Sequence, residues 1–347
     1  MQKTNTRLAN FGFQIVAILL ALGFTTLILL LAGAPPLEAY KNILIGAFGS
    51  FKKFSDVLVA WVPLVIVTTG LLVTFTAGLW NIGIEGQITL GAIFTTWVLR
   101  LLQDTSVPPV LILIISILAG MLGGALWAAI VGALKTYGGV NEIFGGLGMN
   151  FVATALTIYL IFGPWKRPGV GSMSGTVPFA ESLWLPMISG LRLSLWAVLI
   201  AIVALVIIYF LLQGTYFGLR LKSVGKNMRS SFTLGIPTGR YMMSAFFICG
   251  ALAGLAGAIQ VTAVYHRLIP SISSGYGFLG LLLAMLINYR AIWVIPVALF
   301  FAALNIGSIQ LPIILKLDST LSGVLQGALV LSVIIVDGFR QRWMKKS

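Results

Sequence analysis

Long apolar runs recur along the chain, with only short polar stretches between them. A bilayer's hydrocarbon core of about 30 Å is crossed by roughly 20 helical residues. The pattern therefore predicts an all-α fold, that of a polytopic helical membrane protein with about ten spans. The predicted spans are residues 13–33, 57–77, 82–102, 110–133, 146–163, 193–212, 242–264, 278–288, 291–307 and 321–336.

Two parts of this pattern are irregular. The run 278–288 is short, and the stretch 57–102 is almost continuous apart from a break near residues 78–81. Irregular backbone at membrane depth is tolerated where protein or a water-filled cavity covers it. We therefore expect either a tight hairpin or a half-helix near residues 78–90.

The composition agrees with a membrane location. Hydrophobic residues make up 59% of the chain and charged residues 9%, whereas a soluble domain has about 25% charged residues. A soluble enzyme and a disordered chain are thereby excluded. The one cysteine, Cys249, lies inside an apolar run, which excludes a disulfide scaffold and a cysteine-based metal site.

No soluble domain is expected between the spans. The longest connecting segments are 34–56, 164–192 and 213–241, and each is too short to bury a core of its own. We therefore interpret residues 1–347 as a single transmembrane domain.

The net charge of +14 is explained by membrane topology. Cytoplasmic loops carry an excess of Lys and Arg. With both the N-terminus and the C-terminus inside, most basic residues are cytoplasmic, including five in the segment 213–241. Residues 213–241 are then a cytoplasmic loop and 164–192 an external loop. Nucleic acid is not needed as a partner to explain the charge.

Glu85 is the one acid placed inside a predicted span. An ionised carboxylate is costly in hydrocarbon and normally faces a cavity or a partner group. Asn81 and Gln87 lie within a turn or two of it, and Asn150 and Asn305 are further polar residues within apolar runs. Two interpretations stay open: a polar lining of a substrate path, or hydrogen bonds that only hold helices together.

Nothing in the sequence indicates a catalytic or cofactor site. The phosphate-binding pattern G-x-x-x-x-G-K-[ST] is missing, so the chain is not expected to bind ATP by that route. A G-x-G-x-x-G pattern at 275–280 opens an apolar run and follows no strand, so we interpret it as the flexible start of a membrane helix. His266 is the single histidine, and we expect no metal site.

The segment 213–241 reads QGTYFGLRLKSVGKNMRSSFTLGIPTGRY. Its centre is compatible with a short helix that stops at Gly235 and Pro237. A short helix projecting from the bilayer would let a soluble motor dock, but a plain basic loop fits the pattern equally well.

Several motifs together resemble one family. The loop FGLRLKSVGKNMRSSFTLGIP and the following AFFICGALAGLAGAI resemble permease subunits of ABC importers, in the branch with ribose, branched-chain amino acid and nucleoside permeases. NIGIEGQITLGA (81–92), GGVNEIFGGLGMN (138–150) and GYGFLGLLLAMLI (275–287) are most similar to the nucleoside and simple-sugar permeases. The resemblance covers residues from about 57 to 336.

This resemblance implies a multi-pass permease of the inner or plasma membrane that imports a nucleoside or simple sugar. The chain itself would have no ATPase site, no enzymatic activity and no cofactor. Its partners would be ATP-binding subunits at the cytoplasmic loop, a second permease (a copy of this chain or a different one), membrane lipid, and an extracytoplasmic binding protein that meets 164–192.

The family's ATPase-coupling segment maps onto eight residues of this loop. Lys226 stands where the family usually has an acid, and Ser230 and Ser231 stand where it usually has alanines. The eight residues are Gly225, Lys226, Asn227, Ser230, Ser231, Gly235, Ile236 and Pro237.

An ion-coupled secondary transporter is the alternative. It would need no ATPase and would place a proton or sodium ion at Glu85. A single buried acid and the lack of a clear inverted repeat weaken this interpretation.

Overall fold

The computed structural model describes residues 19–20, 22–169, 175–316, 323–328, 331–332 and 335, and within these ranges every regular element is a helix. The all-α class predicted from the apolar runs is thereby confirmed.

A π-helical turn, η2 (Gln260–Tyr265), continues α10 (Thr238–Ile259), and short 3-10 turns form η1 (Glu181–Leu183) and η3 (Ala291–Trp293). The α-helices are α2 (Pro36–Phe48), α3 (Phe51–Thr76), α4 (Ile84–Leu102), α5 (Pro109–Thr136), α6 (Glu142–Phe162), α7 (Leu195–Gly214), α8 (Tyr216–Lys226), α9 (Met228–Thr233), α10 (Thr238–Ile259), α11 (Tyr276–Leu286), α12 (Val294–Ser308) and α13 (Gln310–Leu315).

Six helices in the described residues are long and apolar enough to cross a membrane, or seven if the bent pair Leu22–Leu31 and Pro36–Phe48 forms one span. The predicted count of about ten is not confirmed. α4 is 19 residues long but carries Glu85, Gln87 and Arg100 and is not among the six. α11 has only 11 residues. The predicted spans 13–33 and 321–336 lie partly outside the described residues.

The connection between α3 and α4 is a tight turn rather than the half-helix considered near 78–90. Residues 77–83 are non-helical, and residues 84–90 belong to the uninterrupted helix α4. Gly78 has φ +72°, in the left-handed region where glycine has no Cβ penalty. A short non-helical connection therefore joins two continuous helices here.

The chain divides into two compact units, one of residues 1–60 with 299–347 and the other of residues 61–298. In the first unit, the helix Leu22–Leu31 and α2 are bent by 109° relative to each other. α2 packs closely on α12 and α13, since a side chain at Gly46 would lie 2.6 Å from the Gln310 side chain and 2.7 Å from the Gly307 carbonyl. Leu29, Ile43 and Leu311 are buried in this unit.

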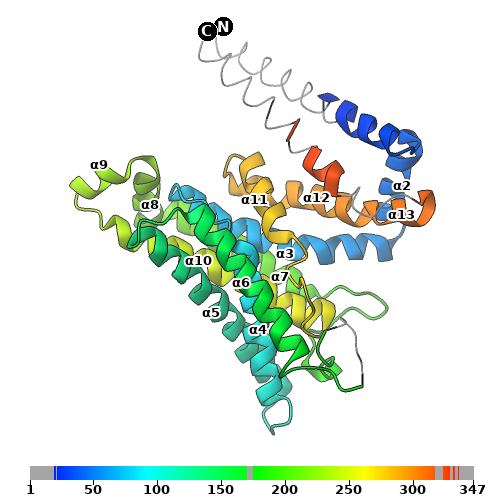
Figure 1. The fold of residues 1–347 in the computed structure, drawn as a ribbon, viewed down its shortest axis with the longest axis horizontal. Helices are drawn as coiled ribbons and strands as arrows, with labels where there is room; N and C mark the ends of the chain where they lie inside the picture. Colours follow the sequence, from blue (N-terminus) through cyan, green and yellow to red (C-terminus); the bar gives the residue numbers. More distant parts are fainter. Residues whose placement is uncertain are drawn as a thin grey trace. The chain divides into compact units, whose positions relative to one another are not determined.

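The second unit is built around α4, α5 and α10, which lie side by side (Figure 1). The helices approach through glycines: a side chain at Gly254 of α10 would meet the Gly120 carbonyl, and one at Gly91 of α4 would meet the Gly254 backbone. Small residues permit such close helix crossings in membranes. α6 packs along α4 on the outside of this group.

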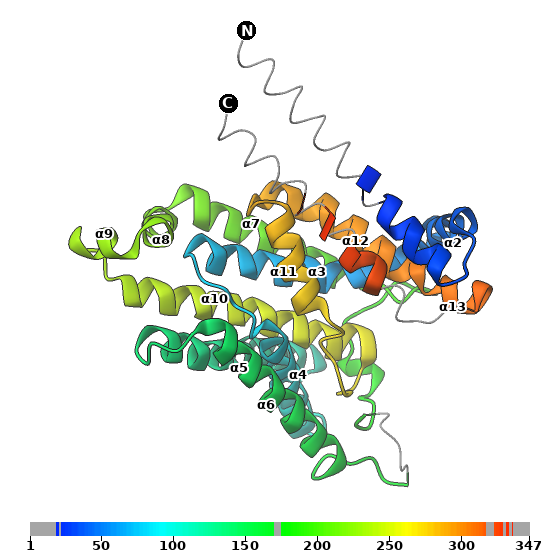
Figure 2. The same ribbon diagram turned by 45° about the horizontal axis from the view of Figure 1, so that its top comes forward.

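α8 and α9 project from one end of the second unit, beside the start of α10 (Figure 2). The end of α3 is at this same end, because a side chain at Gly225 of α8 would meet the Thr76 carbonyl. The turn between α5 and α6 is there too, with Thr136 Cγ2 3.2 Å from the Cβ position of Gly239. The segments that the charge pattern predicts to be cytoplasmic in this unit therefore share one end.

Candidate functional site

A cavity of about 340 Å³ in the second unit contains two of the predicted pathway residues, Glu85 and Asn150. Its walls come from α4, α6, the segment 270–275 and the first turn of α11. Hydroxyl and aromatic side chains dominate the remaining lining, which consists of Thr89, Leu147, Phe151, Thr154, Thr157, Ile158, Pro270, Ser271, Ser273, Gly275 and Phe278.

Glu85 links the cavity wall to the start of α11. Its Oε1 accepts a hydrogen bond of 2.9 Å from the backbone N–H of Phe278. Gly277 leaves room for this contact, because a Cβ there would lie 2.8 Å from Oε1. A carboxylate at a helix N-terminus satisfies a free N–H and interacts favourably with the helix dipole. The G-x-G-x-x-G segment thus opens the apolar helix α11, and Glu85 caps it.

Asn81 and Gln87 pair with each other and are fully buried. The Asn81 amide donates to Gln87 Oε1 at 2.9 Å, and the Gln87 amide donates to Asn81 Oδ1 at 2.8 Å. Asn81 Nδ2 also lies 3.1 Å from the Cys249 sulfur on α10. These bonds fix the turn 77–83 against α4 and α10. Neither residue is among those that line the cavity, and their part in a pathway stays a prediction.

Asn150 connects α6 to the same turn. Its Oδ1 accepts from the Gly86 N–H at 2.8 Å, and its Nδ2 donates to the Ile82 carbonyl at 2.9 Å. Its side chain therefore both lines the cavity and braces its wall. Asn305 lies on α12 in the first unit and is not among the lining residues.

The predicted coupling segment forms two short helices joined at Asn227. The Asn227 side chain caps α9 by accepting from the Ser230 N–H at 3.0 Å. The hydroxyls of Ser223 and buried Ser231 lie 2.9 Å apart and hold α9 against α8. Gly235 follows α9 with φ +80°, a left-handed conformation that suits glycine after a helix end. The short helix considered for this loop is therefore present.

The four remaining predicted coupling residues play different parts in this arrangement. Gly225 is a packing contact against the end of α3. Lys226 and Pro237 are exposed, and Ile236 is half-buried, with its N–H bonded to the Ser231 carbonyl at 3.0 Å. Their contact with an ATPase stays a prediction.

An apolar surface on this projection was not predicted from the sequence. Met228, Phe232 and Leu234 are 42%, 69% and 77% exposed. Exposed apolar side chains on a polar projection are typical of a contact surface. The i, i+4 spacing of Met228 and Phe232, which places both on one helix face, was the signal available in the sequence.

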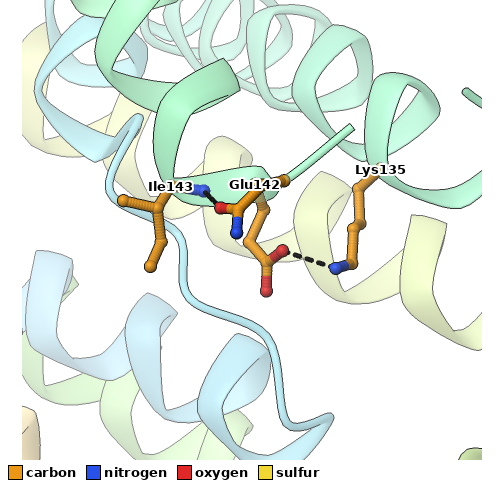
Figure 3. A network of polar contacts seen from close by, with 4 residues as sticks. Lys135, Glu142 and Ile143 are labelled. Carbon is orange, nitrogen blue, oxygen red and sulfur yellow. Dashed lines mark hydrogen bonds and ion pairs between the residues drawn. The ribbon is translucent and has the colours of Figure 1, made fainter. Parts of the chain in front are cut away.

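An ion pair closes the turn between α5 and α6 at the same end of the unit. Lys135 Nζ lies 2.6 Å from Glu142 Oε2, and the Asn141 side chain caps α6 by accepting from the Ile143 N–H at 2.8 Å (Figure 3). No other ion pair occurs in the described part of the chain.

At the opposite end, part of the predicted external loop lies along the segment that follows α10. The Phe179 N–H donates to the His266 carbonyl at 2.9 Å, and the Trp184 and His266 rings stack with centroids 3.7 Å apart. Burial, and secondarily the charge of Arg192, lowers the pKa of His266, which favours the neutral ring in this stack. Residues 170–174 of the predicted loop lie outside the described residues.

The described residues contain no group of three or more His, Cys, Asp and Glu side chains that could hold a metal ion.

Comparison with known proteins gives the family. The family model described as "Branched-chain amino acid transport system / permease component" matches residues 53–334. The chain belongs to this family. It is thus the membrane-spanning permease subunit of an ABC transporter, as the motifs predicted, and a transport component rather than an enzyme. The family implies a separate ATP-binding subunit and a substrate-binding protein as partners.

Individual relatives agree with this assignment. The permease is 30% identical to a glucose ABC transporter permease protein of Haloferax volcanii, over 95% of this chain and 89% of the relative. It is 28% identical to a guanosine ABC transporter permease protein of Bacillus subtilis, over 88% of each chain. It is 26% identical to a nucleoside ABC transporter permease protein of Lactococcus lactis, over 88% of this chain and 85% of the relative. No solved structure matches it.

Proposed function

We propose that this permease passes a nucleoside or a simple sugar into the cell along a pathway that includes the Glu85 cavity. The lining carries this proposal: a carboxylate, an amide and several hydroxyls share the cavity with Phe151 and Phe278. Polar groups of this kind bind sugar hydroxyls, and aromatic rings offer an apolar face to a planar base or sugar ring. The glucose, guanosine and nucleoside permeases among the relatives handle ligands of this chemistry.

ATP-binding subunits would drive the transport from outside this chain. They would dock at α9 and at the end of α8, where Phe232 and Leu234 are exposed beside the basic residues Lys226 and Arg229. A second permease subunit would complete the pathway, and the external segment 164–192 would receive substrate from an extracytoplasmic binding protein.

The substrate class is tested by uptake into proteoliposomes that contain this permease with its partner subunits and binding protein. A radiolabelled nucleoside, glucose and a branched-chain amino acid are compared, with ATP supplied on the side of the ATPase. We expect ATP-dependent uptake of the nucleoside or the sugar. Uptake of only the amino acid would refute the proposed substrate, and uptake driven by an ion gradient without ATP would favour the ion-coupled alternative at Glu85.

A matched pair of serine variants tests the pathway. Ser273 lines the cavity, whereas Ser244 is half-buried on α10, does not line the cavity and donates its hydroxyl to the Arg240 carbonyl. Loss of one hydrogen bond to substrate is worth about 0.5–1.5 kcal/mol. Ser273→Ala should therefore weaken apparent substrate affinity about two- to tenfold, and Ser244→Ala should leave it unchanged. Equal uptake kinetics in both variants would remove Ser273 from the pathway.

A further inference from the structure

A second cavity, of about 330 Å³, lies where α3 and α7 end and α8 passes across them. It shares no residue with the Glu85 cavity. Phe75 and Leu212 give it an apolar wall, Tyr209 and Tyr289 border it, and Lys222 and Lys226 add two ammonium groups. Because α8 belongs to the segment predicted to be cytoplasmic, this cavity is placed at the inner edge of the membrane.

The two lysines carry charge that no carboxylate in the described residues offsets. Lys222 Nζ donates to the neutral Gln213 side chain at 2.9 Å. None of the acids in the described ranges lines this cavity. Lys135, at the same end of the unit, is instead paired with Glu142 at 2.6 Å. The cavity therefore has a net positive lining, which favours an anion.

The backbone gives the cavity a defined shape. Asn288 and Tyr289 both adopt left-handed φ values, +49° and +59°, which are uncommon for residues with a Cβ. This conformation holds the Tyr289 ring 4.9 Å from the Phe75 ring, both at the cavity wall. On the α8 side, Gly225 lies so close to the Thr76 carbonyl that no side chain would fit. Backbone held in an unfavourable conformation is concentrated at ligand sites.

We propose that this cavity binds a phosphate group, carried either by an anionic lipid headgroup of the inner leaflet or by a soluble phosphate ester. Lysine ammonium groups are point charges that bind phosphate, and the tyrosine hydroxyls and Gln213 amide supply further donors. Lys and Arg at the cytoplasmic membrane surface each add about 1 kcal/mol of attraction to anionic lipid. Loss of both lysine charges should accordingly weaken binding about thirtyfold.

The test uses the full-length permease in nanodiscs of phosphatidylcholine, with or without phosphatidylglycerol, and native mass spectrometry of retained lipid. We expect retained phosphatidylglycerol for the wild type, and about thirtyfold weaker retention for the double variant Lys222→Gln, Lys226→Gln. The double variant Lys222→Arg, Lys226→Arg keeps both positive charges and should retain phosphatidylglycerol like the wild type. The matched control is Arg229→Gln, Arg240→Gln, which removes two exposed charges at residues that do not line the cavity and should retain lipid like the wild type.

The wild type alone provides a second readout that does not depend on the variants folding. An amine-acetylating reagent should modify Lys222 and Lys226 more slowly with phosphatidylglycerol present, while Lys52 serves as the reference. Protection by glycerol 3-phosphate in phosphatidylcholine nanodiscs would identify a soluble phosphate ester as the source instead. Equal lipid retention in the Gln variant and the wild type without protection by glycerol 3-phosphate, or protection only when an ATP-binding subunit is bound, would overturn the inference.

Discussion

Glu85 has two roles at the scale of a single residue. It lines the cavity and also caps α11 through the Phe278 N–H, 193 residues further along the chain. The sequence singled out Glu85 because an acid in an apolar run needs a polar partner. The identity of that partner was not predictable, since it depends on how α4 and α11 pack together.

Substitution of Glu85 separates these two roles. Glu85→Ala removes the acceptor for Phe278 N–H, and loss of a helix cap costs about 0.5–2 kcal/mol. Glu85→Gln keeps an acceptor oxygen but removes the charge. Thermal unfolding in detergent should therefore show Glu85→Ala less stable than Glu85→Gln, while substrate uptake falls in both. If Glu85→Ala unfolds at the wild-type temperature, the capping role is wrong.

At the scale of elements, the glycine crossing of α5 and α10 could be predicted from the sequence. Gly120, Gly124, Gly250 and Gly254 recur at four-residue spacing, which puts small residues on one face of each helix. The structure confirms that these faces meet. The turn 77–83 was harder to predict, because the contact of Asn81 with the Cys249 sulfur depends on how α10 packs against the turn.

Two glycine-to-alanine variants test the crossing. A Cβ at Gly254 would overlap the Gly120 carbonyl, whereas one at Gly148 on α6 would meet nothing within 4 Å. Overpacking typically costs 1–3 kcal/mol, and alanine in an open helical position stabilises by about 0.4–1 kcal/mol. Gly254→Ala should lower the unfolding temperature, and Gly148→Ala should keep or raise it. Equal unfolding temperatures for the two variants would mean that α5 and α10 can move apart at Gly254 without loss of stability.

At the scale of the whole molecule, composition predicted the membrane class, and the motifs predicted the family. The predicted number of spans is not confirmed. The length of an apolar run does not by itself distinguish a full span from the short helix α11 or from α4, which carries polar side chains. The short helix considered for the segment 213–241 is present, and its role in ATPase coupling stays a prediction. The exposed residues Phe232 and Leu234 were not predicted. Their exposure depends on how α9 stands away from the bundle, which local sequence does not encode.

The most direct measurement is affinity purification of the tagged permease from native membranes in mild detergent, followed by mass spectrometry. We expect a P-loop ATPase to co-purify in comparable amount. A hot-spot residue near the centre of an interface costs about 2 kcal/mol or more when it is truncated, so Phe232→Ala, Leu234→Ala should reduce its recovery about tenfold or more.

The control pair is Tyr216→Ala, Leu219→Ala on α8, whose side chains are 82% and 64% exposed. It should retain the ATPase like the wild type. Recovery of the wild-type chain without any ATPase would contradict ATP-driven transport through this subunit. Full recovery of the ATPase with the Phe232 and Leu234 variant would instead contradict docking at α9.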